Sequence, residues 1–225
     1  MTFIKLDFRL VEVSYALYAL EDQLSLIEQQ LEEIKNRESA ELNAFLRSIT
    51  PDDPEGEYRS QAFSERNEFV YPRFFRGSLL ISLYAVYESA VTEIARLIQK
   101  KKGLKISLDD IKGDFLERSK KYYEHVLDFP VCTTNPTWEQ IRKLSVIRNA
   151  FAHANGRIEM LRGSVREELE KWSRKGTGIK CDISHLSVDA SFVSTTLKCV
   201  QSSLEDLIER YKTLDTNNHL GAFRD

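Results

Sequence analysis

The stretch FFRGSLLISLYAVYESAVTEIARLIQKKK, residues 74–102, decides the fold class of this chain. Apolar side chains occupy almost every face of the helix that this stretch would form, which predicts a central helix buried on several sides. Glu88 interrupts the apolar run, and a buried carboxylate needs a hydrogen-bonding or cationic partner. Two interpretations stay open: Glu88 points to solvent, or it faces a polar cleft and holds an arginine.

The N-terminal segment carries a heptad pattern, in which apolar residues alternate spacings of four and three. These residues are Leu6, Leu10, Val13, Leu17, Leu20, Leu24, Ile27, Leu31 and Ile34. The pattern predicts a long amphipathic helix from about residue 5 to the high forties, where TPDDPEGE, residues 50–57, ends it. The partner of this helix is either the rest of the same chain, as in an antiparallel bundle, or a second copy in a coiled coil.

The remaining pattern also favours helices, and we predict one all-α domain over residues 1–225: an antiparallel helical bundle with the long N-terminal helix at 1–50 and a core at 70–215. The chain has 225 residues, 30% charged and 42% hydrophobic, with nine glycines and five prolines, a balance that favours long helices over a turn-rich β fold. Further helices are expected over about 57–70 and from Arg73, just after Pro72. Another should precede the loop at 130–136, and the next should start at a Thr137 cap. The last two are expected at 157–175 and 187–214, separated by a loop and an extended piece at 176–187.

Several function classes are disfavoured by composition. The net charge of −3 provides no global basic field, so contact with nucleic acid must be local. Three cysteines form no CxxC pair, and the histidines lack ligand-like spacing, so we expect no disulfide framework, metal or cofactor. The N-terminus has no signal-peptide pattern, and the longest apolar run is too short to span a membrane. A cytoplasmic protein with no membrane partner is the expectation.

The candidate chemistry lies in SVIRNAFAHANGR, residues 145–157, at the predicted end of a helix whose apolar face packs into the core. The guanidinium of Arg148 suits a phosphate and the charge that builds on it during reaction. The imidazole of His153 exchanges protons near neutral pH. Arg148 and His153 therefore form a candidate catalytic pair for metal-free RNA cleavage, in which the ribose 2′-hydroxyl is the nucleophile.

Helical geometry limits what one copy of this pair can do. Arg148 lies about 140° around the helix axis from His153, whereas Asn149 and His153 share a face. A cleft between two copies of the helix would bring an arginine and a histidine from each chain around one phosphate, which predicts a homodimer. The alternative is that His153 only satisfies carbonyls in the last turn of its helix.

The motif RNAFAH resembles the R-x4-6-H motif of the HEPN superfamily, including the polar Asn149 after the arginine. LLISLYAVYESAVTEIARLI is similar to the helix that precedes the motif helix in stand-alone prokaryotic HEPN proteins, with its embedded Glu88. LSVDASFVSTTLKCVQSSLEDL is similar to their closing helix. The resemblance covers about residues 70–215.

This resemblance implies a dimeric, metal-independent endoribonuclease of a toxin-antitoxin or antiphage-defence system, with RNA as its substrate and a cognate antitoxin or regulatory protein as a possible partner. It makes Arg148 and His153 catalytic, while Asn149 orients the site and Glu88 braces Arg148. Asn155 stands where some HEPN toxins carry a modified tyrosine, so that form of control is not expected. A non-catalytic interaction module or antitoxin-like subunit is the alternative function.

RNA binding would need local positive charge, for which three lysine-rich stretches are candidates: residues 99–105, 117–123 and 172–180. Within the first two, we predict substrate contacts from Lys101, Lys102, Lys120 and Lys121. Each stretch has an ordinary alternative as solvated surface, and lysines in the last turn of a helix also complement its dipole.

Overall fold

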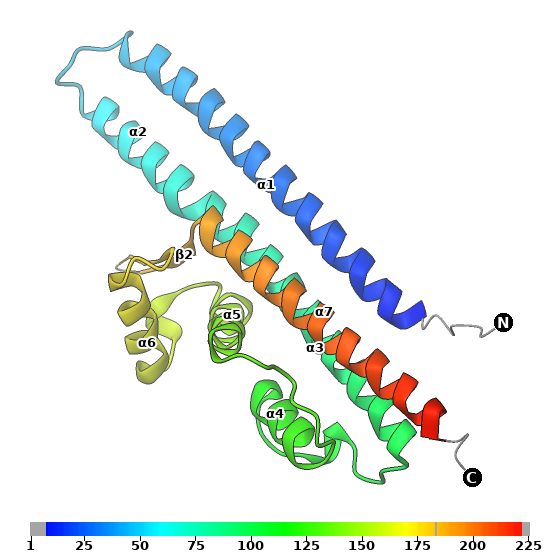
Figure 1. Ribbon diagram of the computed structural model, residues 1–225. Helices are drawn as coiled ribbons and strands as arrows, with labels where there is room; N and C mark the ends of the chain where they lie inside the picture. The colour runs from blue at the N-terminus through cyan, green and yellow to red at the C-terminus, as the bar shows by residue number, and fades with distance from the viewer. Residues whose placement is uncertain (1–7, 183, 222–225) are drawn as a thin grey trace. The chain divides into compact units, whose positions relative to one another are not determined.

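The computed structural model describes residues 8–182 and 184–221, and it confirms the predicted all-α class (Figure 1). Its helices are α1 Phe8–Leu46, α2 Pro54–Glu65, α3 Tyr71–Lys102, α4 Phe115–His125, α5 Asn135–Ala154, α6 Gly163–Arg174 and α7 Ala190–Gly221. The small remainder includes one antiparallel hairpin of β1 Ile179–Cys181 and β2 Leu186–Val188. Within the described residues, no helix combines the length and the apolar character needed to cross a membrane.

The chain divides into two compact units. The first unit comprises Met1–Ala19, Ser82–Ser145 and Thr196–Asp225, and the second comprises Leu20–Ile81 and Val146–Thr195. Four helices, α1, α3, α5 and α7, contribute residues to both units. The single domain over 1–225 stays a prediction.

The first unit has an aromatic core around α3 and α4. Tyr87 and Tyr123 are completely buried, and the Tyr123 hydroxyl donates to the Val91 carbonyl at 2.7 Å. The ring of Phe115 meets Tyr84 edge-on at 6.3 Å between centroids, a favourable aromatic arrangement. The α3 residues Leu83, Ala90, Val91, Ile94, Ala95 and Ile98 are at most 1% exposed. The predicted multi-sided burial of this helix is therefore confirmed.

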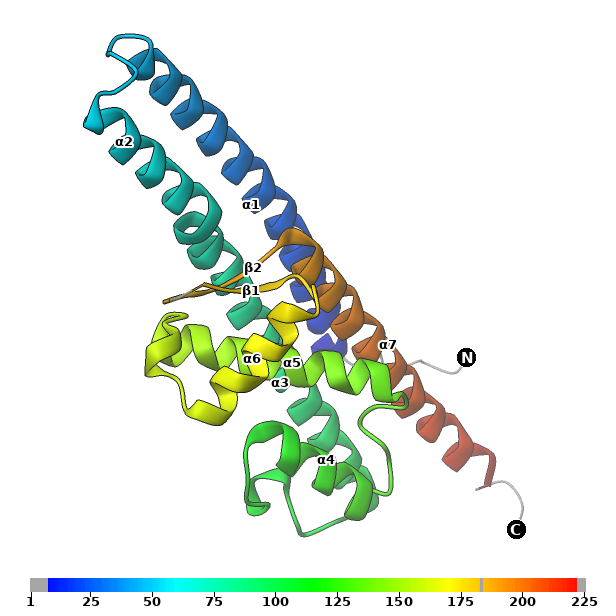
Figure 2. The ribbon, with the colours of Figure 1, turned by 90° about the vertical axis from the view of Figure 1, so that its left-hand side faces the viewer.

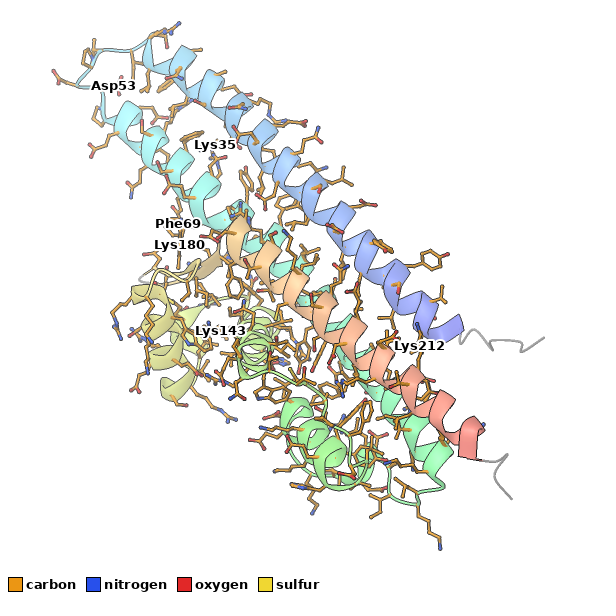
Figure 3. All side chains as sticks on the ribbon, in the orientation of Figure 1. Lys35, Asp53, Phe69, Lys143, Lys180 and Lys212 are labelled. Carbon is orange, nitrogen blue, oxygen red and sulfur yellow. The ribbon has the colours of Figure 1, made fainter. Side chains whose placement is uncertain are left out.

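The second unit contains an antiparallel pair formed by the second half of α1 and α2, which lie side by side in Figures 1 and 2. The turn between them ends at Asp53, labelled in Figure 3, whose side chain accepts from the Glu55 amide at 2.9 Å and caps α2. Pro54 takes the first helical position, where its missing N–H costs nothing. Helix α2 therefore starts three residues earlier than the expected residue 57.

The heptad seam of α1 is buried at four of its described positions and half-buried at Val13, Leu24, Leu31 and Ile34. Leu10 and Leu17 are buried in the first unit, and Leu20 and Ile27 are buried in the second. Leu6 lies outside the described residues. These four positions are therefore covered by the rest of the same chain, which is the first of the two partners considered for this helix.

Pro72 does not separate two helices, contrary to the sequence expectation. A π-helical turn, Arg66–Val70, joins α2 directly to α3, and the Tyr71 amide donates to the Arg66 carbonyl five residues back. A proline removes one hydrogen bond and clashes with the carbonyl four residues before it. The wider π turn moves that carbonyl out of the ring's way, so the chain stays helical through Pro72.

The expected loop and extended piece at 176–187 form a hairpin beside α6, as Figure 2 shows. Ile179 pairs with Val188, and the Cys181 amide donates to the Ser173 hydroxyl of α6 at 3.2 Å. Ile179, Leu186 and Val188 are buried with Trp172 of α6. This hairpin provides a rigid edge in the second unit against which the end of α5 is held.

Candidate functional site

The candidate motif lies on α5, which begins at Asn135 rather than near Thr137. The Trp138 amide donates to the Thr134 carbonyl at 3.1 Å, and the Thr134 hydroxyl donates to that of Thr137 at 2.8 Å. Pro136 has the fixed φ that suits a first helical turn. The predicted Thr137 cap is therefore wrong: Thr137 lies inside the first turn.

The last two turns of α5 are amphipathic within the second unit. Ile147 and Ala150 are at most 1% exposed, whereas Asn149 and His153 are exposed and Arg148 is half-buried. The prediction that the apolar face of this helix packs into the core is thus confirmed. The motif side chains lie outside this apolar face: Asn149 and His153 share one side of the helix, and Arg148 lies about 140° from His153.

The end of α5 is held by a left-handed turn. Asn155 and Gly156 have φ values of 51° and 72°, and the Gly156 amide donates to the Ala150 carbonyl at 3.0 Å. Asparagine tolerates this conformation and glycine adopts it freely, which gives Asn155 a structural reason to stand two positions after His153.

The chain then joins the hairpin strand directly after the turn. The Leu186 amide donates to the Gly156 carbonyl at 2.7 Å, and the Ile158 amide donates to the Ser184 carbonyl at 2.9 Å. Because these bonds follow His153 by only a few residues, they limit fraying of the helical turn that carries it.

Two of the motif side chains are in direct contact. Arg148 donates from a terminal guanidinium nitrogen to Oδ1 of Asn149 at 2.9 Å. Asn149 thus constrains the arginine, and its role in orienting a catalytic site stays a prediction. Among the described residues, none forms a hydrogen bond or ion pair with the His153 ring, and the residue is exposed.

Glu88 and the four predicted substrate lysines belong to the first unit, whereas Arg148, Asn149 and His153 belong to the second. Glu88 is half-buried on α3, and the Thr92 hydroxyl donates to its backbone carbonyl at 2.8 Å. The bracing of Arg148 by Glu88 stays a prediction.

The predicted substrate lysines have local neighbours in the first unit. Lys102 donates to the Leu127 carbonyl, and half-buried Lys101 lies beside it in the last turn of α3. Lys120 lies 5.4 Å from the Trp138 ring centroid, and Lys121 lies 3.8 Å from the Glu117 carboxylate. Such contacts are typical of a solvated helical surface, so their contact with RNA stays a prediction.

A second group of basic side chains, two arginines and a histidine, lies at the end of α5, and the sequence analysis missed it. Arg73 lies in the first turn of α3, Arg157 follows the α5 turn, and His185 pairs with Arg157 in an isolated antiparallel bridge. Burial lowers the pKa of Arg73, and the charge of Arg157 lowers it further. Burial and then Arg73 also lower the pKa of His185. These residues lie far apart in the sequence, and no spacing rule connects them.

A separate hollow of about 340 Å³ lies between α1 and α2 in the second unit. Its walls include Glu38, which accepts hydrogen bonds from Tyr71 at 2.7 Å and Asn67 at 3.0 Å and pairs with Arg66 at 3.2 Å. Burial raises the pKa of Glu38, but these bonds and the Arg66 charge outweigh it and leave the pKa below its ordinary value. The charges here are paired with one another, which indicates a structural role.

No protein-family model, curated protein or solved structure matches this chain. Within the part of the chain that the structure describes, no group of three or more His, Cys, Asp or Glu side chains is placed to hold a metal ion. The three cysteines are free and half-buried. The chemistry available at the end of α5 is therefore that of arginine, asparagine and histidine.

Proposed function

We propose that this protein is a metal-independent endoribonuclease of the HEPN type. One observation carries the proposal: α5 carries Arg148 and His153 outside its buried face, on a helix end fixed by the 155–156 turn and by the hairpin strand. Fixed positions for a phosphate-binding cation and a proton-transfer group are what acid–base catalysis on a phosphodiester requires.

The proposed reaction is an intramolecular displacement on RNA. The 2′-hydroxyl gives its proton to the His153 imidazole as its oxygen bonds to the adjacent phosphorus. The bond from phosphorus to the 5′-oxygen then breaks, and that oxygen takes a proton from the protonated imidazole of the partner subunit's His153. The products are a 2′,3′-cyclic phosphate and a 5′-hydroxyl end. Arg148 stabilises the negative charge that builds on the phosphoryl oxygens.

The two histidines of this scheme call for a homodimer. On one helix, Arg148 and His153 diverge by about 140°, whereas a two-fold axis beside α5 would place both kinds of group on each side of one phosphate. The exposure of His153 and Asn149 leaves this face open to a second copy. The biological setting that we propose is toxin activity or antiphage defence in the cytoplasm, restrained by an antitoxin-like protein.

The test is incubation of the purified protein with total cellular RNA in excess chelator, alongside Arg148→Ala and His153→Ala. His125→Ala is the matched histidine control, because His125 is also exposed in the last turn of a helix, α4. Arg166→Ala, on the exposed surface of α6, is the arginine control. Cleavage is expected only from the unmutated protein and the two controls, with cyclic-phosphate ends.

A non-catalytic interaction module is the second candidate, and a surface feature favours it. Tyr15 and Tyr18, one turn apart on α1, are 70% and 58% exposed. Exposed aromatic side chains are frequent in protein interfaces. If the unmutated protein leaves a broad range of RNAs intact, or if all variants cut equally, the ribonuclease proposal fails and this second function takes its place.

A further inference from the structure

Arg73 is a half-buried cation, and no carboxylate among the described residues forms an ion pair with it. Its Nε atom is buried, and no acceptor among the described residues takes a hydrogen bond from it. Its guanidinium carbon lies 4.9 Å from the ring centroid of Phe74. Removing a guanidinium from water is costly unless an acceptor replaces the lost hydration, so this arrangement favours an anion that binds from outside the chain.

The neighbours of Arg73 add positive charge rather than neutralise it. Arg157 is close enough to lower the pKa of Arg73, and Arg73 in turn lowers that of His185. The isolated bridge between Arg157 and His185 holds these two residues on adjacent strands. Three groups that can donate hydrogen bonds to an oxyanion are thus assembled from three separate segments of the second unit.

Two carboxylates, Glu159 and Asp182, act on His185 in this cluster, and both raise its pKa against the larger lowering by burial. Glu159 also contacts Arg157. It accepts from Nε of Arg157 at 2.9 Å, and both side chains are about half exposed, at 50% and 52%. An exposed pair of this kind contributes little and is readily exchanged for a competing anion. This contact engages Nε of Arg157, and the other two guanidinium nitrogens remain as further donors for an oxyanion.

The cluster borders the proposed catalytic turn. A Cβ atom on Gly156 would lie 3.2 Å from Cδ of Arg73, so the stem of Arg73 packs on the chain three residues after His153. Arg157 follows directly in the sequence. A phosphodiester chain that has one phosphate at His153 would therefore bring a neighbouring phosphate to these arginines.

We propose that Arg73, Arg157 and His185 form a phosphate-binding subsite that holds an RNA backbone phosphate beside the one that is cleaved. This inference rests on the proposed ribonuclease function and names a positioning site for the same substrate. Arg73 and Arg157 supply the charged donors. His185 supplies a third donor through Nε2, in the tautomer whose Nδ1 accepts from the Ser184 hydroxyl at 2.9 Å.

The probe is a short single-stranded RNA with 2′-O-methyl groups, which cannot be cleaved because its nucleophile is blocked. Binding is measured by fluorescence anisotropy over a range of salt concentrations for Arg73→Ala, Arg157→Ala and the Arg166→Ala control. Each cluster variant is expected to weaken binding about 5- to 20-fold and to reduce the slope of log K against log salt by about 0.7, the loss of one phosphate contact. Arg166→Ala is expected to leave both quantities unchanged.

The Arg157 side chain is 52% exposed, so Arg157→Ala should fold normally. Weaker binding by this variant would therefore not be explained by misfolding. If both cluster variants bind within twofold of the unmutated protein and keep its salt slope, the subsite is refuted. Cleavage of unmodified RNA by the unmutated protein, measured in parallel, separates the two proposals. Cleavage without arginine-dependent binding overturns only the subsite, whereas arginine-dependent binding without cleavage overturns only the ribonuclease.

Discussion

Arg73 and Arg76 lie one turn apart on α3, yet their surroundings are opposite. Arg76 donates twice to the Glu28 carboxylate, at 2.6 and 2.8 Å, and once to the Val188 carbonyl at 3.1 Å. Arg73 has an unsatisfied buried Nε and another arginine nearby. Arg76 thus connects α1 to β2, whereas Arg73, on the same helix, keeps donors that a ligand could use.

A similar contrast in charge pairing exists between two regions of the second unit. Between α1 and α2, Glu38 is surrounded by donors that neutralise it. At the end of α5, His153 faces solvent, and Arg73 and Arg157 are close enough to repel each other. Stability therefore depends on the first region and, as we propose, function on the second. Substitutions in the two regions should separate these properties.

The largest expected effect is on activity, from His153→Ala. Loss of a general acid–base group should slow RNA cleavage at least about 100-fold. The free energy of unfolding should stay within about 0.5 kcal/mol, because the side chain is exposed. Single-turnover cleavage and urea denaturation measure the two quantities. A variant that loses stability and activity together would break the proposed separation.

Arg76→Ala should give the largest loss of stability, about 2 kcal/mol, because it leaves Glu28 and the Val188 carbonyl without their charged donor. The Arg76 side chain is only 16% exposed, so water replaces these bonds poorly. Urea denaturation of Arg76→Ala and Arg166→Ala is the measurement. Arg166 forms an exposed pair with Glu170, and its loss should cost less than about 0.5 kcal/mol. Equal effects would contradict the structural role of Arg76.

Glu38→Gln should lower the free energy of unfolding by about 1 kcal/mol near pH 7, and this loss should become smaller at acidic pH. The folded-state pKa of Glu38 is lowered, so its contribution is complete above the unfolded pKa and is lost as pH falls through the folded value. The difference between the two proteins should therefore shrink below about pH 4.5. Denaturation curves at several pH values test this, with Glu41→Gln, an exposed carboxylate on the same helix, as control. A constant difference would refute the pairing.

Arg73→Ala should have the smallest effect on stability, within about 0.5 kcal/mol, and the change can be favourable. Its removal ends the repulsion from Arg157 and the burial of an unsatisfied nitrogen, which offsets the lost packing of its stem on Gly156. Thermal unfolding beside Arg76→Ala provides the comparison. A loss as large as that of Arg76→Ala would mean that Arg73 also holds the fold together.

Periodicity predicted the long helices well, because burial along a helix repeats locally. Four heptad positions of α1, Leu10, Leu17, Leu20 and Ile27, and the apolar faces of α3 and α5 are buried as expected. Proline and cap positions were predicted less well. Pro72 continues a helix through a π turn, and α5 begins before Thr137, since neighbouring residues decide how a chain accommodates proline.

The sequence by itself determined the all-α class, the course of α1 and α3, and the presence of Arg148, Asn149 and His153 on one helix, because each depends on residues a few positions apart. Only the tertiary structure decided that Arg73, Arg157 and His185 share one region while Arg76 pairs with Glu28. The physical reason is that the state of a charged side chain depends on the atoms packed around it, and these come from segments that are remote in sequence.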